Sequence, residues 1–193
     1  MSLGGYREPV WDEQIRKMSH ERRYIRLLTE RTVEHFLLRF FLRDVPIRSL
    51  CIVSPYISAL EGSRFTLYDL SDKILRERIP TYVVTRPPAE KYQQDAIDVL
   101  TGNEWVEIRF NEMVHAKVYV SSAYSESESF ALFGSGNLTD RSVISNIEVG
   151  MLIVAQGLGR PLVEELHYWA NNRLRILEES KLHQRIRGTR RKP

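Results

Sequence analysis

Three short segments of the sequence combine the residue types that phosphodiester chemistry requires. The first holds His115 and Lys117, the second runs from Gly134 to Asn137, and the third is Glu148. An imidazole beside an ammonium suits a phosphate, because Lys117 can neutralise its charge while His115 attacks phosphorus or passes a proton. Neither role needs a metal ion, so we expect a catalytic site without metal or cofactor.

His115 and Lys117 fall in a predicted strand, Val114–Ser121. Residues two apart share one face of a strand, which would align both side chains with Tyr119. A histidine and a lysine at this spacing are also common on a surface or an edge strand, so the other two segments decide the interpretation.

The glycine-rich turn offers a place for an anion. Gly134 and Gly136 would let the backbone approach a ligand closely, and Ser135 and Asn137 carry side-chain donors. Exposed backbone amides in such a turn favour an anion. We assign Asn137 a catalytic role and Ser135 and Gly136 a substrate-binding role; an ordinary glycine turn is the alternative.

Glu148 lies eleven residues beyond Asn137, in a strand predicted over Ile147–Val154. A carboxylate bonded to one ring nitrogen would fix the tautomer and orientation of His115 and stabilise its imidazolium form. An exposed strand glutamate is the alternative, and the two other segments favour the orienting role.

Three further residues follow predicted strands. Ser54, Tyr56 and Arg86 stand at the expected carboxyl ends of strands, where ligands collect in α/β sheets. They are candidate substrate contacts, and packing of loops would explain them equally well.

The elements that must position these residues alternate between strand and helix. The predicted strands are Ile47–Val53, Thr81–Thr85 and Trp105–Phe110, and the predicted helices between them are Arg64–Arg78 and Ala89–Leu100. This alternation implies right-handed crossovers and a largely parallel sheet flanked by helices.

Beyond residue 114 the rhythm changes. The apolar runs Val114–Ser121, Phe130–Gly134 and Ile147–Val154 have no helix between them, which predicts hairpin-type or mixed pairing. A closing helix is predicted over Leu158–Glu179. Its expected buried side consists of Leu162, Leu166, Trp169, Leu174 and Leu177.

Residues 11–43 are predicted to form an N-terminal helical extension. Its apolar residues recur at three- and four-residue spacing: Val33, Phe36, Leu37, Phe40 and Phe41. The whole chain of 193 residues is expected to be a single domain, with an α/β core at 47–179 and a basic tail at 180–193.

The net charge of +3 is unevenly distributed. Lys181 to Pro193 carries six Lys or Arg and no acidic residue, which leaves 22 basic against 25 acidic residues elsewhere. Such a tail could neutralise the phosphates of nucleic acid or meet an anionic membrane surface. A solvated terminus is the alternative.

The sequence also indicates in which compartment the protein is expected. The sequence has no apolar run of about 18 residues and no basic-then-apolar leader, which predicts no membrane span, no secretory signal and a cytoplasmic protein. Cys51 is the single cysteine, which excludes an internal disulfide and a cysteine-based zinc site. Its apolar surroundings predict a buried, inert thiol.

In these motifs the chain resembles the phospholipase D superfamily, in particular its small nuclease-like members. The resemblance is carried by His115-Ala116-Lys117, Gly134-Ser135-Gly136-Asn137 and Asn146-Ile147-Glu148, with support from Ser54-Pro55-Tyr56 and Thr85-Arg86-Pro87-Pro88. It implies a phospholipase D-like α/β fold. It also implies a reaction in which one histidine attacks phosphorus to form a phosphohistidine, a second histidine protonates the leaving oxygen, and water hydrolyses the intermediate.

The sequence departs from the family pattern in one place. The fuller motif has an aspartate five residues after the lysine, where this chain has Ser122. That aspartate is usually regarded as structural. The stretch from Lys117 to Gly134 is also longer than in the compact pattern, consistent with an enlarged hairpin tip at Tyr124–Ser129.

The two-histidine mechanism needs two copies of the motif, and the chain has one. No lysine follows two residues after any of the other histidines: His20, His35, His167 and His183. A two-fold homodimer would supply the second copy, because an isologous interface sets the same residues opposite one another. A different partner chain, or a longer protein from which this domain is cut, are the alternatives. Two equivalent histidines predict coupled titration and a bell-shaped pH dependence.

Three functions fit these features. The leading hypothesis is a metal-independent, endonuclease-like phosphodiesterase acting on nucleic acid, with DNA favoured over RNA. A larger defence or restriction complex is a candidate partner. The second is a non-catalytic nucleic-acid-binding or assembly module, which the Ser122 departure motivates. Phospholipid hydrolysis or phosphatidyl transfer ranks last, because the sequence lacks an amphipathic or membrane-spanning anchor.

Overall fold

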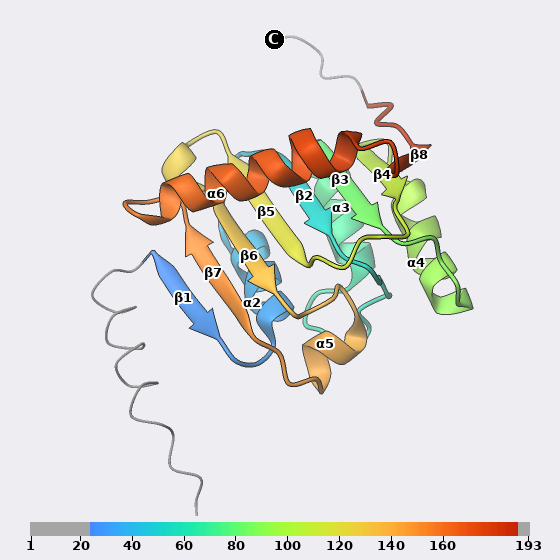
Figure 1. Cartoon of the computed structure of the whole chain (residues 1–193), viewed down its shortest axis with the longest axis horizontal. Helices are drawn as coiled ribbons and strands as arrows, with labels where there is room; N and C mark the ends of the chain where they lie inside the picture. Colours follow the sequence, from blue (N-terminus) through green and yellow to red (C-terminus); the bar gives the residue numbers. More distant parts are fainter. Residues whose placement is uncertain (1–23, 189–193) are drawn as a thin grey trace, which may run out of the picture.

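The computed structural model describes residues 24–188. Within that range the strands are β1 (Ile25–Leu28), β2 (Ile47–Val53), β3 (Thr81–Thr85), β4 (Val106–Phe110), β5 (Val118–Ala123), β6 (Phe130–Gly134), β7 (Gly150–Val154) and β8 (Lys181–Gln184). The α-helices are α2 (Thr32–Leu42), α3 (Leu67–Glu77), α4 (Lys91–Thr101), α5 (Asp140–Ile144) and α6 (Gly159–Tyr168). The strands form one eight-stranded sheet in the order β1-β7-β6-β5-β2-β3-β4-β8. In Figure 1, α2, α3 and α4 lie behind this sheet and α6 crosses its front.

The mixed α/β class is confirmed, with a smaller parallel part than predicted. Strands β2, β3 and β4 are parallel neighbours joined by α3 and α4, as the alternation indicated. Antiparallel pairing joins β5, β6 and β7, and β5 pairs antiparallel with β2. Both edge strands, β1 and β8, are also antiparallel to their neighbours. The parallel strands are therefore confined to one part of the sheet.

Each face of the sheet has its own hydrophobic core. The larger lies beneath the helices α2, α3 and α4, and its buried side chains include Phe36, Phe40 and Leu70. The smaller lies beneath α6 and contains Cys51. Cys51 is buried, as predicted, and burial raises the pKa of its thiol to about 12, which disfavours the reactive thiolate.

The predicted helix over residues 11–43 is wrong in its middle part. Residues 25–28 form β1, which pairs with the edge of β7, and α2 begins only after Arg31, whose φ of 48° is left-handed. The open hydrogen-bonding edge of β7 outweighs the local helical preference of this stretch. Residues 11–23 lie outside the described range. The apolar stripe of α2 is confirmed, since Phe36 and Phe40 are buried.

The closing helix is shorter than predicted, and its buried side is different. α6 ends at Tyr168 and passes through a π-helical turn and a 3₁₀ turn that ends at Ile176. The residues that meet the sheet are Val163, Ala170 and Leu174. A π-turn adds a residue to the helical repeat, so the apolar face rotates after it. Of the predicted buried side, Leu174 is buried and Leu166 and Trp169 are partly buried, whereas Leu162 and Leu177 are exposed.

Besides β1, two further short elements were not predicted. β8 occupies the first part of the supposed basic tail and pairs with β4. α5 is too short for hydrophobic periodicity to show. Three strands also begin later than predicted: β4 at Val106, β5 at Val118 and β7 at Gly150. His115, Lys117 and Glu148 therefore precede their strands and do not lie within them.

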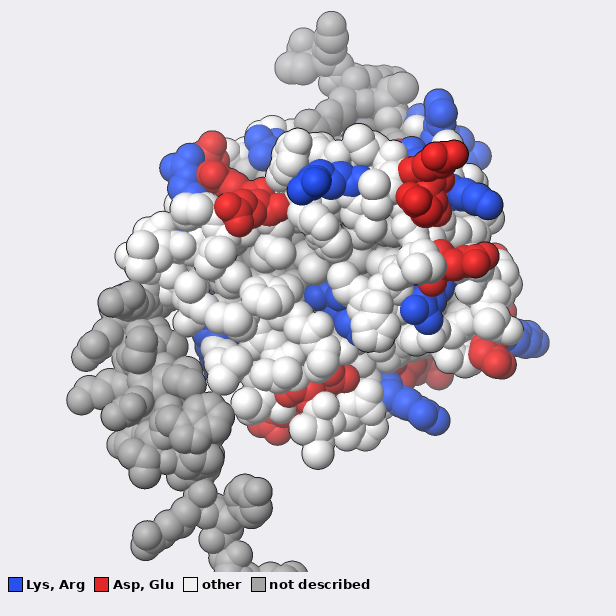
Figure 2. Space-filling view, viewed as in Figure 1, with Lys and Arg blue, Asp and Glu red and all other residues white. Residues whose placement is uncertain are grey.

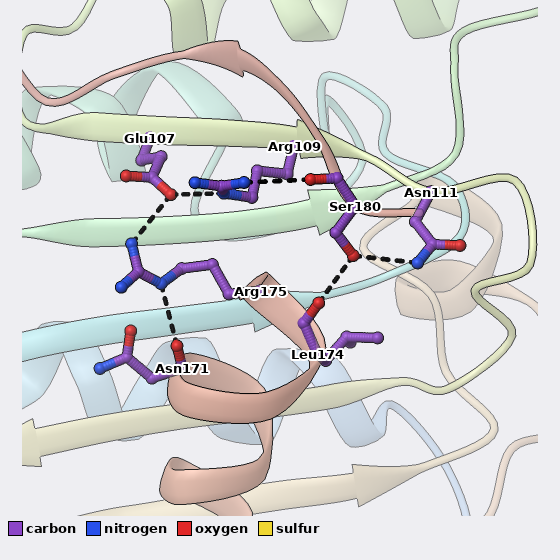
Figure 3. A network of polar contacts seen from close by, with 7 residues as sticks. All are labelled: Glu107, Arg109, Asn111, Asn171, Leu174, Arg175 and Ser180. Carbon is purple, nitrogen blue, oxygen red and sulfur yellow. Dashed lines mark hydrogen bonds and ion pairs between the residues drawn. The ribbon is translucent and has the colours of Figure 1, made fainter. Parts of the chain in front are cut away.

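A polar network attaches the segment after α6 to β4 (Figure 3). The carboxylate of Glu107 accepts hydrogen bonds from Arg109 Nε at 2.8 Å and Arg175 Nη1 at 2.9 Å. The guanidinium of Arg175 also lies over the ring of Tyr82 and donates from Nε to the carbonyl of Asn171. We call Glu107, Arg109 and Arg175 the β4 clamp.

Asn111 connects the β4 clamp to the turn that precedes His115. Its Nδ2 donates to Ser180 Oγ at 2.9 Å, and Ser180 Oγ donates to the carbonyl of Leu174 (Figure 3). On its other side, Asn111 Oδ1 accepts the backbone N–H of Met113 at 2.9 Å. One buried amide thus holds both the C-terminal segment and this turn.

Candidate active site

The antiparallel pairing of three strands brings the three predicted segments to one edge of the sheet. His115 and Lys117 come just before β5, residues 135–137 follow β6, and Glu148 comes just before β7. Antiparallel neighbours place the start of one strand beside the end of the next. The contact is direct: Gly134 N donates to the carbonyl of Lys117, and Ser135 N donates to the carbonyl of Val149.

Glu148 is buried and its carboxylate is held by two side chains. Ser135 Oγ donates to one oxygen, and Asn146 Nδ2 donates to the other at 3.2 Å. Within this chain the expected hydrogen bond from the His115 ring to the Glu148 carboxylate is not formed; Ser135 and Asn146 are the donors instead. The carboxylate is therefore fixed in position before any ligand or second subunit arrives.

Lys117 lies among charged groups of both signs. Partial burial lowers the pKa of its ammonium, the Arg86 guanidinium lowers it further, and the Glu148 carboxylate opposes them. Lys117 Nζ donates to the backbone carbonyl of His115 at 2.8 Å. Two cations and one anion thus surround the space in front of this strand end, and a bound phosphate would relieve the repulsion between the cations.

His115 has a held backbone and an exposed ring. Arg86 Nε donates to the carbonyl of Val114 at 2.9 Å, and Lys117 holds the next carbonyl. Among residues 24–188 the imidazole makes no hydrogen bond. Its position is determined by the backbone, while both ring nitrogens remain available to a ligand.

Asn137 carries a buried oxygen without a partner. Its Oδ1 accepts no hydrogen bond from any described residue, although its backbone N–H donates to Ser142 Oγ at 3.0 Å. An unpaired buried carbonyl is costly, and a catalytic role or a bound water or ion is among the explanations for such a group in a native protein.

Gly134 and Gly136 are needed for close packing of the chain on itself. A Cβ on Gly134 would lie 2.3 Å from the carbonyl oxygen of Val149, and one on Gly136 would lie 2.6 Å from Oγ1 of Thr32. The first contact lets β6 approach β7, and the second lets the turn approach α2. This packing, which the sequence prediction attributed to a ligand, brings Gly136 close to Glu148, whose Cδ would lie 3.8 Å from a Cβ on that glycine.

The three candidate substrate contacts differ in exposure. Ser54 is fully buried; its Oγ donates to the carbonyl of Tyr56 and accepts the N–H of Leu138, so it joins two loops. Tyr56 and Arg86 reach the surface and meet each other, with Arg86 Nη1 donating to the Tyr56 hydroxyl at 3.1 Å. For Ser54 the geometry fits the loop-packing alternative.

Sequence reasoning missed a cleft of about 1020 Å³ beside these residues. Tyr56 and Asn137 line it, together with Tyr68 at the start of α3 and Tyr92 at the start of α4. No local pattern marks these tyrosines, because only the topology brings the two helices beside the loop that follows β6. The sequence also assigned no role to Tyr119. This side chain is buried, and its hydroxyl donates a hydrogen bond to the Gly136 carbonyl at 2.8 Å.

Charge on the visible face is mixed. Figure 2 shows Lys and Arg scattered among Asp and Glu, with no continuous basic stripe on this side. In the described part of the chain, no cluster of three or more His, Cys, Asp or Glu could hold a metal ion. No helix between residues 24 and 188 is both long and apolar enough to cross a bilayer.

Comparison with known proteins identifies the family. A family model described as "Cardiolipin synthase, PLD-like domain" matches residues 11–173. The chain therefore belongs to the phospholipase D-like family, as its motifs indicated, and membership supports a phosphodiesterase-type hydrolase. A search of the curated proteins finds no match.

Solved structures with the same fold include two small proteins of similar size. Nuc from Salmonella typhimurium, a phospholipase D family member, is 12% identical with a TM-score of 0.58, over 83% of this chain and 99% of Nuc. NucT from Helicobacter pylori is 12% identical with a TM-score of 0.57, over 82% and 98%. Polyphosphate kinase from Porphyromonas gingivalis is 11% identical with a TM-score of 0.55, over 86% of this chain and 28% of that one. Because the fold also occurs in a kinase, the site residues must indicate the reaction.

Proposed function

We propose that the protein is a metal-independent phosphodiesterase of the nuclease type, acting on nucleic acid. The observation that carries this proposal is the convergence of His115, Lys117, Asn137 and Glu148, the half-site, at the adjoining ends of three strands. Lys117 and Arg86 supply positive charge for a phosphate, and the exposed His115 ring supplies the nucleophile.

The proposed reaction uses two histidines. Neutral His115 attacks phosphorus, forming a nitrogen–phosphorus bond as the bond to the leaving oxygen breaks. Protonated His115 of the partner subunit gives its proton to that oxygen. The same ring then takes a proton from water, which attacks the phosphohistidine and frees His115. Lys117 neutralises charge on the non-bridging oxygens.

A homodimer completes the site in this proposal. Exposed apolar side chains beside the half-site favour a covering partner. Ile147 is 98% exposed beside Glu148, and Met113 is 81% exposed close to His115. Apolar groups gathered around a site commonly mark an interface. DNA rather than RNA, a cytoplasmic setting and a larger defence complex remain predictions that rest on the sequence.

The binding-only alternative draws on Ser122, and the geometry gives it little support. Ser122 is buried in the last part of β5, where its Oγ accepts a hydrogen bond from Arg48 at 3.1 Å. The departure from the family pattern therefore falls at a structural position away from the half-site. Salt-dependent binding of an oligonucleotide without turnover would favour this alternative.

Cleavage of a fluorescent oligonucleotide in the presence of EDTA tests the proposal. Wild type should cleave, His115→Ala should not, and His183→Ala should match wild type because His183 lies on β8 against Phe110. Equal cleavage by wild type and His115→Ala would contradict the proposal, as would complete inhibition by EDTA. Hydrolysis of phospholipid vesicles without oligonucleotide cleavage would favour the lipid alternative.

Solution mass tests the dimer separately. Analytical ultracentrifugation at assay concentrations should give twice the mass of one chain. An active protein that sediments strictly as a monomer would contradict the shared catalytic centre while leaving the phosphodiesterase activity established.

A further inference from the structure

The cleft beside the half-site opens directly onto the proposed chemistry. Tyr56 and Asn137 line it, and so does Asn146, which donates a hydrogen bond to Glu148. A phosphodiester held at Lys117 would therefore place one of its two substituents at the mouth of this cleft.

Three tyrosine rings distinguish the walls of the cleft. Tyr68 is 61% exposed, Tyr92 is 53% exposed and Tyr56 is 40% exposed. They come from three places in the fold: the start of α3, the start of α4 and the loop after β2. Exposed aromatic faces along a groove are the surfaces on which unpaired bases stack.

The charge of the cleft opposes a phosphate backbone. Four carboxylates line it, from Glu61, Asp95, Asp98 and Asp140, against a single arginine, Arg141. Within residues 24–188, the carboxylates of Glu61 and Asp95 form no hydrogen bond or ion pair. They can accept hydrogen bonds from the amino groups of bases, whereas a chain of phosphates passing through the cleft would be repelled.

Arg141 is the one cation among the described residues that line the cleft, whereas two cations lie on the half-site side of this boundary. Lys117 and Arg86 face the position proposed for the scissile phosphate, and the acidic, tyrosine-lined cleft begins beyond Tyr56. A substrate that fits both parts has a phosphate at one end and an uncharged, flat, hydrogen-bonding group at the other. Duplex bases do not meet this requirement, because neighbouring bases cover their faces and the paired strand occupies their edges.

We propose that this cleft binds unpaired nucleobases next to the scissile phosphate, so that the substrate is single-stranded nucleic acid. This inference rests on the proposed phosphodiesterase function and adds its substrate class. Tyr68 and Tyr92 determine the specificity by stacking, and Asp95 accepts hydrogen bonds from the bases.

Kinetics on matched substrates test the inference. Four proteins are assayed on one labelled sequence, as a single strand and as a hairpin duplex. They are wild type, the double alanine variant of Tyr68 and Tyr92, the double phenylalanine variant of the same two residues, and Tyr168→Ala. Tyr168 is the control because it is also an exposed tyrosine, on α6 across the sheet from α3 and α4. Methyl p-nitrophenyl phosphate reports the chemical step in wild type without offering a base.

Wild type should prefer the single strand by about tenfold or more in kcat/KM. The double alanine variant should lose about tenfold on the single strand through KM, while the double phenylalanine variant keeps the preference because it retains the ring faces. Tyr168→Ala should behave as wild type. A purely structural role for the tyrosines would not produce this selective rise in KM.

Two results would overturn the inference while the proposed function stands: equal cleavage of single strand and duplex by wild type, or unchanged KM in the alanine variant. Hydrolysis of p-nitrophenyl phosphorylcholine with a KM raised by the alanine pair, without oligonucleotide cleavage, would assign the cleft to a cationic group and also overturn it. Failure of wild type on every substrate would overturn the proposed function itself, and this inference with it.

Discussion

The half-site and the β4 clamp are both clusters of charged and polar residues, and they differ in how completely their groups are paired. In the clamp, the Glu107 carboxylate accepts hydrogen bonds from two arginines. One of them, Arg175, also donates a hydrogen bond to a backbone carbonyl and lies over an aromatic ring. In the half-site, the His115 ring and Asn137 Oδ1 make no hydrogen bond with any described residue.

This difference separates a stabilising role from a chemical one. A satisfied buried network holds one arrangement of the backbone. An unpaired buried oxygen lowers stability, and the exposed imidazole of His115 leaves both ring nitrogens available to a ligand. Perturbing the two regions should therefore affect two different measurements: stability for the clamp and turnover for the half-site.

The largest effect should follow from Lys117→Gln. Loss of the cation that neutralises the phosphate should lower kcat by about 10³-fold, while the free energy of unfolding changes by less than about 0.5 kcal/mol. Urea titration and oligonucleotide kinetics measure the two quantities, with Lys91→Gln in the exposed first turn of α4 as the control. If Lys117→Gln lowered the free energy of unfolding by as much as it raised the activation free energy, the distinction between the regions would be lost.

Glu107→Gln should have the opposite profile. Removing the carboxylate leaves two guanidinium groups without their shared partner, which should cost about 3 kcal/mol of unfolding free energy and lower Tm by about 10 °C. At 20 °C or below, where the variant is still folded, kcat should stay within about twofold of wild type. Calorimetry and kinetics test this, with the exposed Glu104→Gln as the control. Unchanged Tm would mean that the clamp contributes nothing to stability.

Ser180→Ala should sharpen the comparison, because Asn111 joins the two regions. Loss of the Ser180 hydroxyl leaves Asn111 Nδ2 without its acceptor, which should lower the free energy of unfolding by about 1 to 2 kcal/mol. Because Asn111 also holds the turn before His115, kcat should fall by severalfold while KM is unchanged. Stability loss with kcat unaffected would show that the turn keeps its position without this contact.

The smallest effect is on the titration of Lys117. Burial and Arg86 lower the pKa of its ammonium, so the group should lose its proton at a lower pH than an ordinary lysine. Arg86→Gln removes a repelling cation and should raise that pKa, whereas Glu148→Gln removes an attracting anion and should lower it further. Nuclear magnetic resonance of lysine side chains labelled at Cε measures the direction of each shift, and Arg86→Lys should retain the wild-type direction. If the pKa of Lys117 shifted in the opposite directions, Arg86 and Glu148 would not act on its ammonium as described.

Hydrophobic patterning was sufficient to predict much of the core fold. The strands β2, β3 and β6, and the helices between β2 and β4, lie where apolar runs and turn residues indicated, because each buries a continuous apolar face. The edge strands β1 and β8 were missed because their pairing depends on a neighbour's open edge and not on their own sequence. The π-turn after α6 was missed for a similar reason, since packing on the sheet determines it.

The roles of the half-site residues stay predictions from motifs, whereas the surroundings of these residues could not be predicted. His115, Lys117, Asn137 and Glu148 converge as the antiparallel strands require, but the partners of Glu148 turned out to be Ser135 and Asn146. The reason for Gly136 is equally non-local, because the nearby atoms that exclude a side chain belong to α2. The tyrosine-lined cleft depends on two helix starts that only the folded chain brings together.

Isolation of a covalent intermediate would test the central claim most directly. Wild type is mixed with a labelled oligonucleotide in EDTA, quenched in alkali and digested with trypsin, which cuts after Arg109 and Lys117 and releases one peptide containing His115. Mass spectrometry should find the nucleotide phosphate on that peptide in wild type and not in His115→Ala. Steady turnover without any modified Phe110–Lys117 peptide would contradict a phosphohistidine at His115.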